Sequence, residues 1–341
     1  MLRNRKYLSL VSLVVLAVFL FTACSSNTGN SASGGNTQSS GTNQKISLAA
    51  ASPGGTLYIL GSTISKILKD KNGIEVSVES TGGALSNQQL LEENNSTFGI
   101  ITTDISYDAW NGTGTWNKGK PLKNVRTVLP LYVLQLQMIA REDANINKLS
   151  DMNGKVVAAG PAGSAHDTLA RKIFEIFDIK PSKILNLTFD DTADQIRDKK
   201  ADALIVVSSA PNSTLTNIST TIDAVMVSFS DEEIKKIVEE MPYFKPYTIP
   251  ANTYKDQDKD CATVTQWGFF AVNKDQPDEL VYQVTKAVAE NWDVMEGAVN
   301  STKGVKPQDV QSLNLPVHPG AMKYLEEIGV DIPAALQPPA E

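Results

Sequence analysis

The chain has 341 residues and a formal net charge of −7, with 41% hydrophobic and 20% charged residues. This length suggests about two domains, and the hydrophobic content suffices for a buried core, which excludes wholesale disorder. The acidic balance and the lack of a basic stripe argue against a nucleic-acid partner. Two Cys and two His, scattered along the chain, exclude a disulfide scaffold and the usual four-ligand zinc site. We therefore expect no metal and no cofactor.

The first segment has the features of a bacterial lipoprotein signal. Three cations between residues 3 and 6 precede an apolar run at 8–21, which is too short to span a bilayer comfortably. The sequence Phe-Thr-Ala-Cys that ends at Cys24 resembles a lipobox, whose Cys becomes diacylated. We expect cleavage of residues 1–23 and an extracytoplasmic chain, lipid-anchored through Cys24 to the outer face of the cell membrane. An uncleaved N-terminal anchor is the alternative.

Residues 24–45 are predicted to be the lipidated Cys and a flexible tether. Between 25 and 44 the chain contains only Ser, Asn, Gly, Thr, Gln and one Ala, so it cannot offset its ordering entropy by burial. Loss of three cations with the signal changes the formal charge from −7 to −10. Lipidation of Cys24 leaves Cys261 without a disulfide partner, and we expect Cys261 to be a small buried thiol.

The body begins with a repeat of strand, turn and helix. Strands are predicted at 46–51, 75–80 and 98–101, and glycine turns followed by helical apolar spacing come after the first two. Such a repeat predicts a parallel sheet covered by helices, with the strand-to-helix turns at one edge of the sheet.

The same rhythm restarts near residue 155. The predicted elements are strands at 155–159, 203–207 and 267–272, and helices that follow Ser164, Ser230 and Pro277, the last of them running to Met295. The two similar halves predict an α/β fold with two lobes, each a mostly parallel sheet flanked by helices.

Three glycine turns, at 54–56, 81–83 and 163–164, are candidate anion sites. Each precedes a predicted helix, whose first N–H groups lack partners and carry partial positive charge. One such turn alone is more often a plain tight turn with an N-cap. Three of them at the ends of predicted strands favour joint binding of one carboxylate or phosphate.

Enzyme signatures are weak in this chain. Ser164, His166 and Asp167 are too close in sequence for a catalytic triad, and the local string GPAGSA does not match G-x-S-x-G. The glycine turns lack the Lys of a Walker loop and the spacing of G-x-G-x-x-G. His166 is predicted as a surface helix residue, Asp190 with Asp191 as an exposed helix start, and His318 as a turn residue. We therefore do not expect an enzyme.

The ordered motifs of the body resemble those of the TAXI family of TRAP transporter solute receptors. The motifs are SPGGTLY at 52–58, TGGALSN at 81–87, DISYDAWNG at 104–112, GKV with GPAGS between 154 and 164, ADA at 201–203 and HPGA at 318–321. They cover essentially the whole mature body. The departures from the family pattern are Pro53 for Gly, Leu57 for an aromatic residue, Ser86 for Glu, and Ala165 with His166 for Gly-Thr.

The resemblance implies a two-lobed periplasmic-binding-protein fold of the second type. Lobe I would comprise residues 46–136 and 267–341, and lobe II residues 137–266. The implied function is capture of a small carboxylate, such as glutamate, glutamine or a related dicarboxylate, and its delivery to the TRAP membrane permease without ATP hydrolysis. We expect a monomer. A same-fold lipoprotein that serves an ABC transporter or a sensor kinase is the alternative.

The resemblance and the turns together define the predicted ligand-binding residues. They are Gly55, Thr56, Tyr58, Thr81, Gly82, Gly83, Ser86, Asp104 and Tyr107 from lobe I, and Gly163, Ser164 and Ala165 from lobe II. Backbone N–H groups and hydroxyls are expected to bind the solute carboxylate, with Tyr58 and Tyr107 as walls. Asp104 is expected either to receive an α-ammonium group or simply to end its strand.

Overall fold

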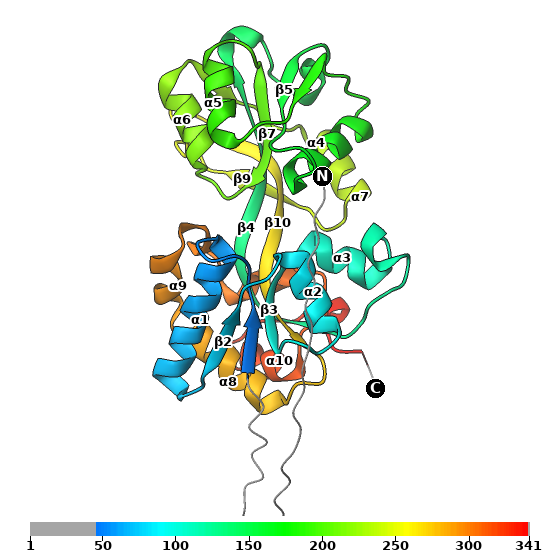
Figure 1. Cartoon of the computed structure of the whole chain (residues 1–341), viewed down its shortest axis with the longest axis vertical. Helices are drawn as coiled ribbons and strands as arrows, with labels where there is room; N and C mark the ends of the chain where they lie inside the picture. Colours follow the sequence, from blue (N-terminus) through cyan, green and yellow to red (C-terminus); the bar gives the residue numbers. More distant parts are fainter. Residues whose placement is uncertain (1–45, 340–341) are drawn as a thin grey trace, which may run out of the picture. The chain divides into compact units, whose positions relative to one another are not determined.

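The computed structural model describes residues 46–339, so the predicted signal peptide, Cys24 and the whole predicted tether lie outside the described residues. Strands and helices alternate through this part of the chain, and two long strands pass between its two lobes (Figure 1). Within residues 46–339, no helix has both the length and the apolar character needed to cross a membrane.

Lobe I combines the first third of the described chain with its C-terminal part. Its elements are β1 (Ile46–Ala49), α1 (Thr56–Asn72), β2 (Val76–Glu79), α2 (Ala84–Glu92), β3 (Phe98–Thr102), α3 (Thr103–Asn111), α8 (Asp278–Ala289), α9 (Trp292–Ala298) and α10 (Pro319–Glu327). The crossing strands are β4 (Val125–Arg141) and β10 (Cys261–Asn273).

Lobe II lies between the crossing strands in the sequence. Its elements are β5 (Val156–Ala158), α4 (Ala165–Ile176), β6 (Lys183–Leu185), α5 (Phe189–Arg197), β7 (Ala203–Ser208), α6 (Ser213–Thr221), β8 (Ala224–Met226), α7 (Asp231–Glu240) and β9 (Lys245–Ile249). Short 3-10 helices connect several elements of both lobes, among them Asn300–Thr302 and Pro307–Ser312.

One sheet runs through both lobes in the order β2-β1-β3-β10-β4-β7-β5-β6. The pairs β1–β2, β1–β3, β5–β6 and β5–β7 are parallel. The crossing strands break this pattern, because β10 is antiparallel to β3 and β4, and β4 is antiparallel to β7. The predicted two-lobed α/β fold with mostly parallel strands and flanking helices is therefore confirmed.

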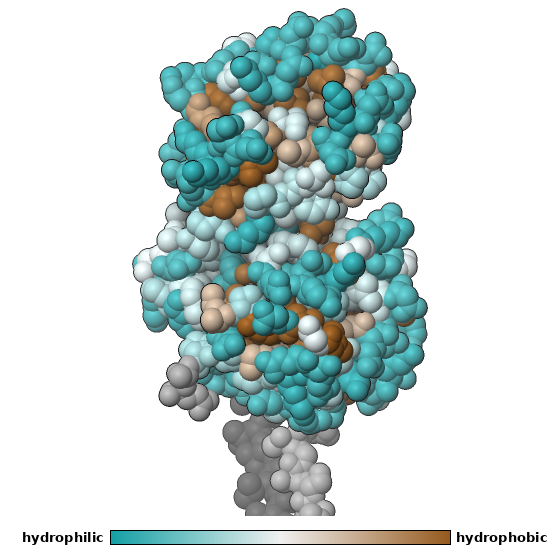
Figure 2. Space-filling model, turned by 180° about the vertical axis from the view of Figure 1, so that it is seen from behind, coloured by the Kyte–Doolittle hydropathy of each residue, from teal (hydrophilic) through white to brown (hydrophobic). Residues whose placement is uncertain are grey.

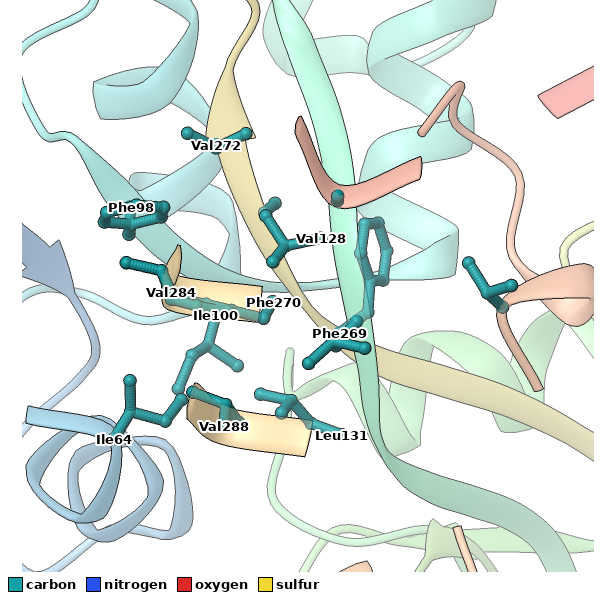
Figure 3. Packing of buried hydrophobic residues seen from close by; sticks show 14 of the residues in the cluster. Ile64, Phe98, Ile100, Val128, Leu131, Phe269, Phe270, Val272, Val284 and Val288 are labelled. Carbon is teal, nitrogen blue, oxygen red and sulfur yellow. The ribbon is translucent and has the colours of Figure 1, made fainter. Parts of the chain in front are cut away.

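The core of lobe I lies between the sheet and its helices (Figure 3). Phe98 of β3 stacks on Phe270 of β10 with 5.1 Å between ring centroids. Ile64 of α1 and Val284 of α8 belong to the same cluster and come from the helix layer. Side chains of successive residues along a strand point to opposite faces, so a sheet with helices on both sides buries both sets.

Lobe II has two further hydrophobic clusters, one on each face of its sheet. Along β4, Met138 belongs to the cluster beneath α4 and α7, whereas Ile139 belongs to the cluster beneath α5 and α6. The lobe I cluster includes Tyr132 and Trp267 of the crossing strands. These separate clusters support the predicted lobe boundaries, which stay a prediction.

The predicted helix from Pro277 to Met295 is two helices, α8 and α9. The Nδ2 group of Asn291 donates a hydrogen bond to the Ala287 carbonyl oxygen at 2.8 Å, which is the oxygen that a continuing helix would offer to the Asn291 N–H. That N–H instead bonds to the Val288 oxygen. Side-chain competition of this kind ends helices, and the period of the apolar residues does not reveal it.

His318 is a fully buried N-cap of α10, not a turn residue as predicted. Its Nδ1 accepts a hydrogen bond from the Gly320 N–H at 3.2 Å. A Cβ on Gly320 would lie 2.1 Å from the Asp278 carbonyl oxygen, so only glycine fits where α10 meets the start of α8. The HPGA motif therefore fixes a helix junction in lobe I.

The surface seen from behind is mostly hydrophilic, and its apolar residues gather in small separate areas of both lobes (Figure 2). Among the described residues, the large apolar side chains that are clearly exposed are those of Ile59, Val294 and Ile328. The face shown in Figure 2 thus offers no continuous apolar surface of the kind that obligate partners bury.

Candidate functional site

Three strand-to-helix turns meet at one edge of the lobe I sheet. Strand β1 pairs in parallel with β2 and β3, with Ala49 opposite both Glu79 and Gly99. Each of these strands leads into the helix that follows it, so the starts of α1, α2 and α3 lie at the same edge. In open α/β sheets this edge, beyond the carboxyl ends of the strands, is where ligands bind.

Helix α1 begins without a side-chain cap. Its N-cap is Gly55, no side chain of residues 46–339 accepts a hydrogen bond from the first turn, and that turn has no acidic residue. Gly54 has φ +85°, a conformation that favours glycine. Gly55 and Thr56 are exposed. The first N–H groups of this 17-residue helix are therefore available to an anion.

Helix α2 begins in the same way. Its N-cap is Gly83, with φ 99° and ψ −162°, and again there is neither a side-chain cap nor an acidic residue in the first turn. A Cβ on Gly82 would lie 2.6 Å from the Ser86 Oγ, so glycine at 82 allows the Ser86 hydroxyl to approach the turn. The sequence therefore correctly predicts two glycine turns that leave helix N-termini open.

Thr81 and Asn87 fix these two turns to each other. The fully buried Asn87 donates hydrogen bonds from Nδ2 to the carbonyl oxygens of Ala50 and Ile100, at 2.6 and 2.7 Å. The Thr81 hydroxyl accepts from the Gly83 N–H and lies 2.6 Å from the Asn87 Oδ1. Thr81, a predicted ligand residue, is thus engaged within the protein and positions the turn.

Asp104 lies in the first turn of α3 and has one oxygen without a partner. Its Oδ1 is shielded from solvent and accepts no hydrogen bond within the described chain. Burial raises the pKa of Asp104, although hydrogen bonds from the Thr102 side chain and from backbone N–H groups act in the opposite direction. No cationic side chain of residues 46–339 lies within 4.0 Å of this carboxylate.

Two tyrosines are close enough to Asp104 for its charge to affect them, Tyr132 of lobe I and Tyr243 of lobe II. Burial, with a further contribution from the Asp104 charge, raises the pKa of Tyr132 on β4 and of Tyr243 after α7. The ring of Tyr243 lies 5.9 Å from the ring of Tyr107 on α3. The Thr103 hydroxyl donates to the Tyr243 carbonyl oxygen at 3.3 Å.

Tyr243 is a residue that the sequence reasoning missed. It belongs to lobe II, yet it contacts α3 of lobe I, and the aromatic run around it has no motif that indicates this contact. Tyr58, the other predicted wall, is half-buried and packs against the lobe I core.

The lobe II turn before α4 is already capped. The Ser164 Oγ accepts from the Asp167 N–H at 3.3 Å, as the capping pattern predicts. The Asp167 carboxylate accepts from the Gly163 N–H at 3.0 Å and from the Arg171 Nε at 2.8 Å. Helix α4 begins at Ala165, and the Asp167 carboxylate offsets the partial positive charge of its N-terminus. This helix start therefore attracts an external anion less than the starts of α1 and α2 do.

The hydrogen bonds of the Asp167 carboxylate also lower its pKa. Burial acts to raise it, but hydrogen bonds from the Gly163 N–H, Asn186 and Arg171 together hold the pKa below its ordinary value. Among the described residues, no hydrogen bond joins the turn at 163–165 to the lobe I turns.

His166 is half-buried, not a surface residue as predicted. Its ring lies edge-on to Phe189 at 5.0 Å, and its Nδ1 is shielded from solvent and has no hydrogen-bond partner within the part of the chain that the structure describes. Burial lowers the pKa of His166, while a backbone contact at Val207 acts in the opposite direction. His166 is the second residue of α4, and its ring contacts Phe189, the first residue of α5.

Arg141 is not available as a carboxylate clamp. At the end of β4, it donates to the side chains of Asp143 and Asp202 and to the Ala201 carbonyl oxygen. The exposed Asp190 and Asp191 lie at the start of α5, where the Thr188 hydroxyl accepts from the Asp191 N–H, as expected of a capped acidic helix start.

A model of the NMT1-like family matches residues 48–329. The chain belongs to the NMT1-like family. A similar solved structure is that of a TctC solute binding protein from Polaromonas without ligand, with 14% identity and a TM-score of 0.52 over 75% of this chain and 87% of that one. This similarity shows the fold. MatC from Rhodopseudomonas palustris with bound malate is 12% identical, with a TM-score of 0.47 over 83% of this chain and 96% of that one.

Proposed function

We propose that this NMT1-like protein is an extracytoplasmic solute receptor of the TAXI type, not an enzyme. It binds a small carboxylate, such as glutamate, glutamine or a related dicarboxylate, between its two lobes and delivers it to a TRAP membrane permease. The family match, the fold shared with a solute-binding protein and the ordered TAXI-like motifs support this proposal. Anchoring through the lipidated Cys24 would hold the receptor at the outer face of the membrane.

The observation that carries the proposal is the pair of open helix starts, α1 and α2. Each helix N-terminus carries about half a positive charge and several unpaired N–H groups. Both starts follow neighbouring strands and are tied together through Thr81 and Asn87. A carboxylate with two oxygens fits this pair of donors, even though the formal charge of −10 on the chain from Cys24 onward repels anions at long range.

Asp104 is proposed to select among carboxylates. Its buried oxygen has no hydrogen-bond partner and no cation beside it in the described chain, which is costly for a carboxylate. The α-ammonium group of an amino acid would supply both the charge and the hydrogen-bond donor. We therefore place glutamate or glutamine ahead of 2-oxoglutarate, which has no ammonium group.

Lobe II is proposed to complete the site when the lobes close. Gly163, Ser164 and Ala165 would cover the solute, and Tyr107 with Tyr243 would form a wall. Rotation about β4 and β10 is the motion that two crossing strands allow. A solute that prefers the closed arrangement shifts the population toward it, and the closed arrangement is what the permease would recognise.

Thermal unfolding tests the proposed function. The chain from residue 24 onward, with Cys24→Ser to prevent lipidation, would be heated with glutamate, glutamine, 2-oxoglutarate and, as a neutral control, glucose. At a concentration of 100 times the Kd, a ligand that binds only the native state should raise the Tm by roughly 5 °C. The absence of a shift with every carboxylate in the panel would contradict this solute class.

A further inference from the structure

A cavity lies at the junction of the lobes, and none of the predicted ligand-binding residues lines it. It has a volume of about 310 Å³. The residues that matter for its chemistry are Val133 of β4, Trp267 of β10, Lys245 and Pro246 of β9, and Lys303 and Val305 after the 3-10 helix Asn300–Thr302. Both lobes therefore contribute to this hinge cavity.

The hinge cavity and Asp104 lie on opposite faces of the crossing strands. Val133 and Trp267 are opposite each other on β4 and β10, and both line the cavity. The neighbouring Tyr132 lies over Gly268 instead, where a Cβ would come within 2.0 Å of its ring. Because consecutive residues of a strand point to opposite faces, Tyr132 and the Asp104 charge beside it lie on the other face.

The cavity has an excess of positive charge. Lys245 is half-buried and Lys303 is exposed, and neither ammonium group has a carboxylate within 4.0 Å among residues 46–339. The acidic residue of the lining is Asp309, whose Oδ2 accepts a hydrogen bond from the Lys306 N–H in the capping of a 3-10 helix. The lining therefore contains two cations and one carboxylate, and that carboxylate already accepts a hydrogen bond within the protein.

The lining of the cavity includes apolar side chains and Trp267, whose indole has a donor without a partner in the described chain. Trp267 is 6% exposed, and its indole Nε1–H has no acceptor among residues 46–339. A buried donor without a partner is unusual in a folded protein and marks a place where a ligand oxygen would be stabilised. Val133, Pro246 and Val305 supply apolar surface beside it.

We propose that the hinge cavity binds a small monocarboxylate that has an apolar body. The carboxylate lies between Lys245 and Lys303, with the Trp267 indole N–H as a further donor, and the apolar body lies against Val133 and Val305. The volume is at the lower end of the range for small-molecule sites, which limits the ligand to a compact acid. This site is independent of the solute site at the helix starts.

The indole N–H resonances of the protein report on this site directly. The four Trp residues give four such resonances in a ¹⁵N-labelled sample, and Trp267→Phe identifies the one from Trp267. Benzoate is the probe, because it is a compact acid with an apolar body. Benzyl alcohol has the same ring without charge, and inorganic phosphate has charge without an apolar body.

Benzoate should move the Trp267 resonance in a saturable way, and benzyl alcohol and phosphate should each move it much less. Lys245→Ala or Lys303→Ala should weaken benzoate binding about tenfold, because each removes a charged hydrogen-bond donor. Lys118→Ala, an exposed lysine outside the cavity, should leave the binding unchanged. Equal shifts with benzyl alcohol, equal shifts with phosphate, or an unchanged benzoate response in both cavity variants would each overturn the proposal.

Discussion

The Thr81 hydroxyl lies 2.6 Å from the Asn87 Oδ1, and this contact joins the turn before α2 to the helix itself. Asn87 extends the connection, because its Nδ2 reaches the Ala50 carbonyl oxygen at the end of β1 and the Ile100 carbonyl oxygen on β3. One buried amide thus links the residue after β1, a carbonyl oxygen of β3 and the turn before α2. We expect the geometry of the proposed anion site to depend on this amide, although Asn87 itself is fully buried.

Replacement of Asn87 by Ala should destabilise the protein and weaken solute binding together. It would remove the buried Nδ2 group that donates to the Ala50 and Ile100 carbonyl oxygens, and for Ala50 it would leave the Thr81 hydroxyl at 3.1 Å as the other donor. We expect a loss of about 2–3 kcal/mol in the free energy of unfolding, measured by urea titration. The exposed Asn95→Ala should cost less than about 0.5 kcal/mol. Equal effects of the two variants would show that the Asn87 amide does not hold the turns.

Thr56→Asp should abolish solute binding without loss of stability. Thr56 is the exposed first residue of α1, and a carboxylate there would occupy the helix start much as Asp167 does in α4. An acidic residue in the first turn stabilises a helix by about 0.3–1 kcal/mol. Binding and the Tm can be compared by calorimetry and thermal unfolding.

Ser213→Asp is the matched control for Thr56→Asp. It places the same charge on the exposed first residue of α6, in lobe II. Solute affinity should be unchanged in this variant. If both variants bind solute as the unmodified chain does, the start of α1 is not part of the site.

Asp104→Asn should stabilise the chain without solute at pH 7 but lower its affinity for amino acids. Burial raises the pKa of Asp104 in the folded state, so stability is lost as the pH rises through that pKa and the carboxylate becomes charged. The neutral amide removes this cost at pH 7, and we expect a higher Tm. It also removes the proposed partner of the α-ammonium group.

The control for Asp104→Asn is Asp108→Asn on the same helix, where the carboxylate already accepts from the Thr113 hydroxyl. It should not change the preference for glutamate over 2-oxoglutarate. A preference that is also unchanged in Asp104→Asn would remove Asp104 from the site, whatever its effect on the Tm.

Asp167→Asn should destabilise the protein at pH 7 and have little effect in strong acid. The folded-state pKa of Asp167 is lowered, so its contribution is present above the ordinary pKa, near 3.8, and is lost as the pH falls through the folded-state pKa. The Tm of both proteins measured from pH 7 to pH 2 should therefore converge at low pH. The exposed Asp178, paired with Lys180, is the matched control, and a difference of equal size in Asp178→Asn would contradict this assignment.

The sequence allowed the strand–turn–helix order and the open turns at Gly55 and Gly83 to be predicted, because apolar period and glycine position are local signals. It did not reveal the contact of Tyr243 with Tyr107, because that contact joins residues from different lobes. The burial of His318 depends in the same way on the approach of α8. The break at Asn291 has a local cause, because one side-chain hydrogen bond replaces a backbone hydrogen bond of the helix. The apolar pattern favours a continuous helix there, so the pattern alone does not predict the break.

Calorimetric titration of the chain from residue 24 onward, with Cys24→Ser, tests the central claim most directly. Glutamate, glutamine and 2-oxoglutarate would each be titrated into this protein and into its Thr56→Asp variant. We predict saturable binding of one carboxylate per chain, stronger for an amino acid than for 2-oxoglutarate and lost in Thr56→Asp. No saturable heat with any of the three, or equal binding by the variant, would contradict a carboxylate site at the open helix starts of lobe I.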